Sequence, residues 1–336
     1  MLNPVLHNKN DQTPIYKQIA KSIAKDIEKG AVKKNFVLPS INVFSENYNV
    51  ARDTVEKAYK KLKQDGYIGS VTGKGYYVLG KKETRLRILL VFNKLSSFKK
   101  IIYYSFLKAL GNKAVVDLHI HHYSPKHLKK IVEANLGQYN HYVIMPHFEV
   151  HTPPRAFKDI LKRIPPHELL LLDKYLPGFD DSKSVYQDFR GDISGALGDA
   201  VELLDKYHTL SIIFPQHSHH PPGIIEGLED FCNQYGKKFS VLTNEDEIKP
   251  AKSVAYIVIA DDDLAALVKK VRKSTLTLGK DIGIISFNES ELKELLDITV
   301  MSTDFKKMGE TAAELILKNE IAQVKNPFVI IKRGSL

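Results

Sequence analysis

The sequence predicts an α/β protein with a small helical head, a short polar linker and a larger two-lobed body built on parallel sheets. A length of 336 residues suggests about two domains. Residues 1–85 carry 16 Lys and Arg against 8 Asp and Glu, so the head holds most of the formal net charge of +10. Beyond residue 86, strand-like and helix-like stretches alternate, which is the order that gives parallel sheets with covering helices.

The composition is that of an ordinary globular protein, with 43% hydrophobic and 26% charged residues. The longest apolar runs, such as residues 88–92, are far shorter than the roughly 20 residues that cross a bilayer. The N-terminus shows no basic start followed by an apolar stretch, and the single cysteine, Cys232, cannot form an internal disulfide. We therefore expect a cytoplasmic protein without a membrane segment.

The sequence of the head, residues 1–80, predicts three consecutive helices. Isoleucines recur every four residues over 15–27, which predicts the first helix. Ser40 is a good N-cap for the second helix, and asparagines within 47–49 favour a tight turn after it. A third helix is expected over about 51–65, because its apolar residues recur at helical spacing. A second helix, a tight turn and a third helix form a helix-turn-helix.

A hairpin is expected after the third helix. Residues 67–71 and 76–79 are strand-like, and Thr72-Gly73-Lys74-Gly75 joins them. Glycines at the tip would let the backbone come close to a phosphate, although a solvated lysine at position 74 is the plainer alternative. The first turn of a recognition helix faces base edges, so the start of the third helix is the expected reading surface.

These pieces together resemble the GntR-family DNA-binding domain, a winged helix-turn-helix. The matching segments are Leu38-Pro39-Ser40, Val50-Ala51-Arg52-Asp53-Thr54-Val55, Gly66-Tyr67-Ile68 and Gly73-Lys74-Gly75-Tyr76-Tyr77-Val78. The family usually has an arginine where Asn42 stands, so the phosphate contacts and the operator sequence are expected to differ. The candidate DNA-contacting residues are Ser40, Asn42, Arg52, Asp53, Thr54, Lys57, Gly73 and Lys74. A solvated lysine-rich helical surface is the alternative to a DNA-binding face.

The expected domain boundaries follow from this alternation of elements. We place the head at 1–80, the linker at 81–86 and the body at 87–336. Two sets of alternating strands and helices in about 250 residues predict two lobes. The first lobe is expected over about 87–184 and 302–324, and the second over about 185–298 and 326–336.

The body resembles the periplasmic-binding-protein-like effector domain of LacI-family regulators. The matching pieces include 185–191, 258–265 and 279–288, in the family's order and spacing. A GntR-type head on a LacI-type body is similar to arabinose-repressor-like and fucose-operon regulators. That resemblance implies a DNA-binding transcriptional regulator that acts as a homodimer on double-stranded operator DNA. The implied effector is a sugar or a sugar derivative, held between the two lobes.

The effector is expected at the carboxyl ends of the strands, where ligands bind in open α/β sheets. Amides, carboxylates and an aromatic face suit a sugar, and residues near these ends supply them. The candidate effector-binding residues are Asn93, Phe98, His147, Asp188, His217, Asp261 and Asn288. For Asp188 the alternative is a cap on the helix that follows it.

Other chemistries find little support in the sequence. Histidines cluster at 119–122 and 217–220, and paired imidazoles could hold Zn²⁺, but neither cluster contains a Cys or Glu to complete a tetrahedral set. We find no motif of a hydrolase, phosphate-binding loop or dinucleotide site. We therefore expect no metal, no cofactor and no catalytic residue. The alternatives are a carbohydrate-binding or sugar-acting protein with an accessory DNA-binding head, and a metal-responsive regulator.

Overall fold

The computed structural model describes residues 13–71, 75–79, 85–149, 151–215 and 220–336. Its contacts divide the chain into two compact units, 1–84 and 85–336, which we call the head and the body. Most of the expected linker, 81–86, lies outside the described residues, and the first strand of the body already begins at Leu86. Among the described residues, no helix is long and apolar enough to span a bilayer.

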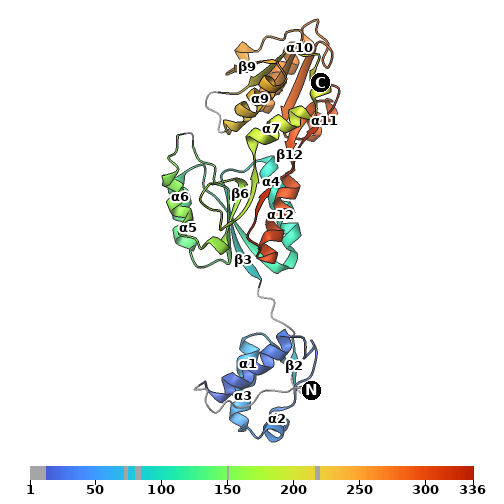
Figure 1. Cartoon of the computed structure of the whole chain (residues 1–336). Coiled ribbons are helices and arrows are strands. Elements are labelled where there is room, and N and C mark those ends of the chain that lie inside the picture. The colour runs from blue at the N-terminus through green and yellow to red at the C-terminus, as the bar shows by residue number, and fades with distance from the viewer. Residues whose placement is uncertain (1–12, 72–74, 80–84, 150, 216–219) are drawn as a thin grey trace. The chain divides into compact units, whose positions relative to one another are not determined.

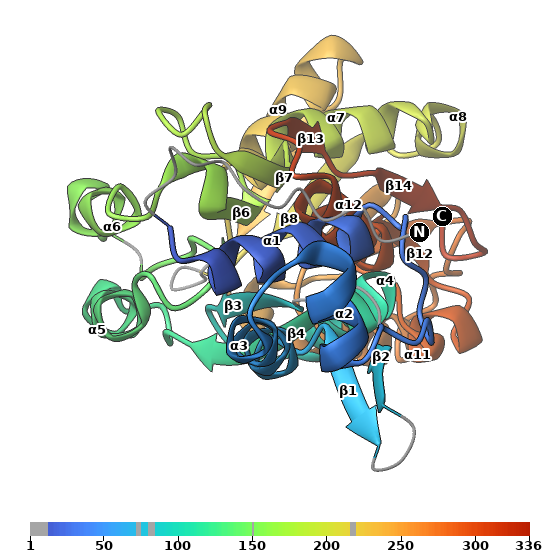
Figure 2. The same ribbon diagram turned by 90° about the horizontal axis from the view of Figure 1, so that it is seen from below.

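Three helices and a hairpin form the head (Figure 1), as the sequence predicts. The elements are α1 (Ile15–Glu28), α2 (Ile41–Tyr48), α3 (Arg52–Gln64), β1 (Ile68–Val71) and β2 (Gly75–Val78). Figure 2 shows α1, α2 and α3 crossing one another, with the hairpin projecting to one side. Ser40 caps α2 by accepting the backbone N–H of Val43 at 3.2 Å, and Asn49 turns the chain in the left-handed region at φ +49°.

The core of the head forms where the apolar stripes of the three helices meet. Ile19 and Ile23 of α1 pack with Phe44 of α2 and with Val55 and Tyr59 of α3, and all five side chains are buried. The segment before α2 also pairs with β2, since residue 37 bridges residue 77. This pairing anchors the hairpin to the segment that leads into α2.

Two six-stranded sheets form the body (Figure 1). Lobe 1 has the strand order β13-β7-β6-β5-β3-β4, all parallel. Its strands are β3 (Leu86–Phe92), β4 (Ala114–Ile120), β5 (His141–Ile144), β6 (Leu169–Lys174), β7 (Lys183–Gln187) and β13 (Gln323–Lys325). Lobe 2 has the order β14-β12-β11-β10-β8-β9, in which only β12 and β14 run antiparallel. Its strands are β8 (Thr209–Ile213), β9 (Lys238–Leu242), β10 (Val254–Val258), β11 (Ile282–Phe287), β12 (Thr299–Thr303) and β14 (Phe328–Ile331).

Helices cover both faces of each sheet, which explains why central strands such as β11 are buried throughout. In lobe 1, α4 (Ser97–Leu110) and α12 (Phe305–Lys318) cover one face, and α5 (Pro125–Asn135) and α6 (Arg155–Leu161) cover the other. In lobe 2, α7 (Phe189–Gly198), α8 (Val201–Leu204) and α9 (Gly223–Gln234) lie opposite α10 (Asp261–Arg272), with α11 (Glu291–Leu295) after β11. Short 3-10 turns span Gly111–Lys113, Pro166–Glu168 and Glu245–Glu247. The helical stretch after β7 is divided into α7 and α8, and Asp188 caps the start of α7.

The chain crosses between the lobes three times, and the crossing points differ slightly from those expected. The first crossing lies after Gln187 rather than at 184–185, because β7 pairs with β6 along its whole length. The second follows Thr303 at the end of β12, and the third passes through Asn326. The Asn326 backbone N–H donates to the carbonyl of Tyr186 at 2.7 Å, which ties the third crossing to the first.

Candidate nucleic-acid interface and ligand cleft

The first turn of α3 presents polar side chains to the outside of the head. Arg52, Asp53 and Lys57 are exposed and Thr54 is half-buried. The opposite side of α3 is buried, and the Tyr59 hydroxyl there donates to the carbonyl of Pro39 at 2.9 Å. This burial fixes the rotation of α3, so its first turn stays available to a duplex.

The start of α2 adds to the same candidate interface. Asn42 and Ser40 are exposed, and the Ser40 hydroxyl is already engaged as the helix cap. The remaining two candidates, Gly73 and Lys74, lie outside the described residues. Lys63 of α3 donates to the Ser70 hydroxyl at 2.8 Å, which links the end of the helix to β1 of the hairpin.

A cleft of about 560 Å³ opens at the carboxyl ends of the strands in the two lobes. Four of the predicted effector-binding residues line it: Asn93, Phe98 and His147 from lobe 1 and Asn288 from lobe 2. Asn93 is only 4% exposed, and its side-chain oxygen accepts no hydrogen bond from any described residue. A buried amide oxygen without a donor is costly, so this atom is suited to accept a hydrogen bond from a ligand.

A buried carboxylate, Asp173, forms the polar centre of the lobe 1 wall. It lies at the end of β6, accepts a hydrogen bond from Lys99 Nζ at 2.7 Å, and lies 3.1 Å from His147 Nε2. The Lys99 ammonium and the His147 hydrogen bond hold the pKa of Asp173 below its ordinary value, against the opposing effect of burial. Burial lowers the pKa of His147, so its imidazole is neutral at neutral pH.

Three residues of the cleft have left-handed backbone conformations. Tyr123 has φ +59°, Asp173 has φ +77° and Asn288 has φ +61°. Non-glycine residues in this region are uncommon and cluster at functional sites, although Asp and Asn tolerate it best. Asp173 and Asn288 occupy strand-end positions, and both line the space between the lobes.

Gln187 links the two lobes beside the cleft. Its side-chain amide donates to Asp173 of lobe 1, and its side-chain oxygen accepts from the Thr303 hydroxyl of lobe 2. Gln187 and Thr303 are also the residues at which the chain leaves β7 and β12. The carboxylate in the cleft is thus connected to two of the three crossing segments.

Aromatic side chains supply the apolar part of the cleft. Phe98 stacks on Phe305, with ring centroids 4.9 Å apart and planes inclined by 22°. Phe287 and Phe328 of lobe 2 lie 6.3 Å apart on the other wall. Flat rings beside hydrogen-bonding groups match a ligand that has both C–H and O–H faces.

Two of the other predicted effector residues, Asp188 and Asp261, do not line the cleft. Asp188 accepts the Gly191 N–H at 3.3 Å and lies 3.6 Å from Lys325, so it is a helix cap with an ion-pair partner. Asp261 is exposed and forms an ion pair with Lys293 at 2.8 Å. His217 lies outside the described residues. The candidate list from the sequence also lacks Lys99, Asp173, Gln187 and Thr303, which line the cleft. The strand-end positions of Asp173, Gln187 and Thr303 are the signal that could have found them. Lys99 lies within α4 and has no such signal.

The histidines near 119–122 do not form a common site. His121 is buried, and its Nε2 lies 2.9 Å from the carbonyl of Met145. In the part of the chain that the structure describes, no group of three or more His, Cys, Asp or Glu could hold a metal ion. His121 is therefore a residue of the lobe 1 core.

Acidification is expected to destabilise the body through two buried histidines. Burial lowers the pKa of His121 and of His141 to about 4, from an ordinary value of 6.5. Between these pH values the unfolded chain binds more protons than the folded chain, so the free energy of unfolding falls as the pH drops from 6.5 to 4. Each histidine contributes a slope of up to about 1.4 kcal/mol per pH unit. Urea unfolding at pH 7.5, 6 and 5 measures the slope, and it should be shallower in His121→Gln and His141→Gln; an unchanged slope in both would contradict this account.

Comparison with known proteins supports the assignment of both units. Residues 15–78 match the family of bacterial regulatory proteins called the gntR family. The chain is similar to the HTH-type transcriptional regulator TreR of Bacillus subtilis (strain 168), with 32% identity over 120 residues, which are 35% of this chain and 47% of that protein. The chain thus spans less than half the length of this curated relative.

Solved structures resemble the chain in fold. A LacI family transcriptional regulator from Enterococcus faecium with bound ribose has 17% identity and a TM-score of 0.58, over 74% of this chain and 98% of that chain. The lac repressor dimer bound to operator and the anti-inducer ONPF has 15% identity and a TM-score of 0.59, over 76% of this chain and 95% of that chain. The predicted fold class is confirmed: a winged helix-turn-helix followed by a two-lobed, periplasmic-binding-protein-like body.

Proposed function

We infer that this chain, whose head belongs to the gntR family of bacterial regulatory proteins, is a transcriptional regulator controlled by a small molecule. The observation that carries the inference is one chain holding a helix-turn-helix with an exposed first turn and a two-lobed body with a polar cleft. The family that residues 15–78 match consists of regulatory proteins, which supports the expectation that the chain is not an enzyme. We place its action in the cytoplasm, where DNA is accessible.

The head would bind double-stranded operator DNA through the start of α3. Arg52, Asp53 and Thr54 would face base edges and adjacent phosphates, and Lys57 would approach the backbone one turn later. Ser40 and Asn42 at the start of α2 would contact phosphate, as would Gly73 and Lys74 at the tip of the hairpin. The excess of positive charge in residues 1–85 supports this assignment, because phosphate neutralisation supplies much of the affinity for DNA.

A sugar or sugar derivative is the effector that the chemistry of the cleft favours. The unpartnered oxygen of Asn93, the amide of Asn288 and the carboxylate of Asp173 can hydrogen-bond to hydroxyl groups. The Phe98 ring can cover a C–H face. The structural relative from Enterococcus faecium holds ribose, which is consistent with such a ligand.

The regulator would act as a homodimer, because twofold symmetry pairs two heads with a palindromic site. Closure of the lobes around the ligand would change the geometry between the heads and so change operator affinity. This mechanism requires the ligand to bind the two states with different affinity, since equal affinity would shift nothing. The bridge from Asp173 through Gln187 to Thr303 offers a path from the ligand to the crossing segments.

Steep salt dependence of DNA binding tests the role of the head. Duplexes selected by the full chain from a random library provide the operator, and fluorescence anisotropy measures its affinity. If a dimer makes about six phosphate contacts, the affinity should fall by roughly 10³-fold between 50 and 200 mM salt. A flat response to salt would contradict the head as the DNA-binding unit. Selection that yields no shared sequence would contradict operator recognition.

A further inference from the structure

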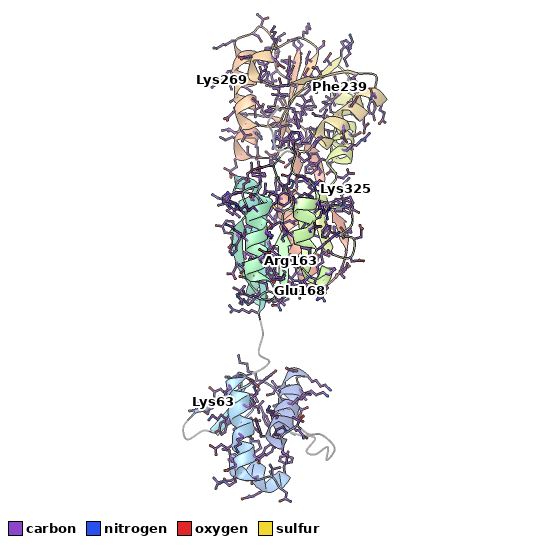
Figure 3. All side chains as sticks on the ribbon, turned by 90° about the vertical axis from the view of Figure 1, so that its left-hand side faces the viewer. Lys63, Arg163, Glu168, Phe239, Lys269 and Lys325 are labelled. Carbon is purple, nitrogen blue, oxygen red and sulfur yellow. The ribbon has the colours of Figure 1, made fainter. Side chains whose placement is uncertain are left out.

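Positive charge in the body is concentrated on the two helices α5 and α6 of lobe 1. Residues 125–135 and 155–163, which we call the basic face, carry seven Lys and Arg against two Asp and Glu. The other residues of 86–336 carry 26 against 29, so the rest of the body is slightly acidic. Figure 3 looks onto this side of lobe 1, and Arg163, which follows α6, is labelled there. Such a local excess of one charge attracts an oppositely charged partner.

Most of the charge on the basic face is not neutralised within the body. Both of its carboxylates are engaged: Glu133 accepts a hydrogen bond from Arg163, and Asp159 lies 3.5 Å from Arg155 Nε. Four exposed lysines form no ion pair with any residue that the structure describes: Lys126, Lys129, Lys130 and Lys162. These lysines are therefore available to carboxylates of another molecule.

Helix α12 of the same lobe shows how a solvated helix surface differs from the basic face. Two of its three lysines lie near a glutamate one turn further along the helix, Lys306 at 3.9 Å from Glu310 and Lys318 at 4.0 Å from Glu314. Such pairs are the usual arrangement on a helix that faces water only. The lysines of α5 have no glutamate of this kind.

A groove of about 620 Å³ lies between α5 and α6 within the basic face. Cations line both of its sides, and apolar atoms lie between them. The lining cations are Lys126, Lys129, Arg155 and Arg163, and the apolar lining residues are Pro125, Ala156 and Ile160. None of these residues lines the cleft between the lobes. Apolar surface between cations is complementary to a segment that carries both carboxylates and apolar side chains.

We propose that the groove between α5 and α6 binds an acidic segment of another protein. Carboxylates of that segment would pair with Lys126 and Lys129, and one of its apolar side chains would rest on Ala156. The head has an excess of positive charge itself, so it does not supply the acidic segment. The groove lies outside both the head and the cleft, so a failure of this proposal leaves the proposed function untouched.

The width of the groove favours a protein segment over nucleic acid. Helices packed side by side lie about 8–10 Å apart, so the space between α5 and α6 admits a single chain segment. A DNA duplex is far wider, since its major groove alone takes up a whole helix. A duplex would meet the outer surfaces of the helices and leave the apolar atoms of Ala156 and Ile160 without a partner.

Binding of a labelled acidic peptide to the full chain tests the charges of the groove. The probe is a helical peptide with glutamates along one side and leucines along the other, and fluorescence anisotropy measures its affinity. Lys126→Glu/Lys129→Glu should weaken binding at least tenfold, because like charges then face each other. Lys249→Glu/Lys280→Glu is the matched control: it makes the same change in net charge at two exposed lysines of lobe 2 and should leave the affinity unchanged. Equal loss in both variants would overturn the groove as the binding site.

A second pair of measurements tests the apolar part of the groove and the nature of its occupant. Ala156→Glu should also weaken the peptide at least tenfold, because Ala156 is exposed in the groove and the longer acidic side chain would occupy it. All the substituted side chains are exposed, so circular dichroism should show unchanged folding. A wild-type chain that does not bind the peptide, or peptide binding that survives both groove variants, would overturn the proposal. If Lys126→Glu/Lys129→Glu weakens binding of a DNA duplex but not of the peptide, the basic face contacts nucleic acid and the proposal is wrong.

Discussion

Arg52→Ala is expected to remove most operator binding while it leaves ligand binding by the body unchanged. Arg52 is exposed in the first turn of α3, and no described residue forms an ion pair with it. Loss of one arginine contact to a base or phosphate costs about 1–3 kcal/mol in each head, so a dimer loses about 2–6 kcal/mol. Fluorescence anisotropy on a selected duplex should therefore show affinity lower by roughly 30-fold or more.

A second charge removal in the head is the control for this experiment. Lys25 of α1 is exposed and lies outside the predicted reading surface, so Lys25→Ala should change operator affinity only slightly. The ligand-induced rise in melting temperature should be the same in wild type and Arg52→Ala. Equal loss of DNA binding and ligand binding in Arg52→Ala would contradict the separation of the two functions between head and body.

Asp173→Asn is expected to lower the stability of the body and to weaken ligand binding. Asparagine keeps the size of the side chain and tolerates the left-handed backbone at this position, so the substitution mainly removes the negative charge. The Lys99 ammonium, 2.7 Å away, would then be buried without a counter-charge. Removing one partner of a buried ion pair costs about 3–5 kcal/mol, which chemical unfolding of the body should reveal.

Two further variants distinguish the cost of leaving Lys99 buried and unpaired from a general effect of mutation. Lys99→Met combined with Asp173→Asn removes both charges, so the double variant should be more stable than Asp173→Asn alone. Asp230→Asn breaks an exposed ion pair with Arg190 and should lower the stability far less than Asp173→Asn does, because water screens the exposed pair. If the double variant were no more stable than the single one, the Lys99–Asp173 pair would not be the source of the effect.

Most of the fold could be predicted because the sequence patterns that specify its helices, strands and turns are local. The isoleucine repeat of α1, the Ser40 cap and the Asn49 turn all act within a few residues. The parallel sheets follow from alternating strand and helix patterns. The division of the chain at its first crossing was less predictable, because the end of β7 is set by pairing with β6, which no pattern within β7 itself reveals.

The residues of the cleft were predictable only where a local pattern places them. Asn93 and Asn288 follow strands directly and His147 lies three residues after β5, so topology alone places them at the correct edge of the sheets. Asp188 and Asp261 also follow strands, but a helix N-terminus and Lys293 engage them. Lys99 reaches Asp173 across 74 residues of sequence, and Gln187 reaches Thr303 across 116, and no local pattern predicts such contacts.

Operator affinity measured with and without a stabilising sugar tests the central claim most directly. A thermal-shift screen of the full chain against monosaccharides and their phosphates identifies the sugar; a ligand at 100 times its dissociation constant adds about 2.7 kcal/mol of stability. Anisotropy on the selected duplex should then show an affinity changed at least tenfold by that sugar, and unchanged by it in a variant that no longer binds it. A sugar that raises the melting temperature but leaves operator affinity the same would contradict ligand-controlled DNA binding.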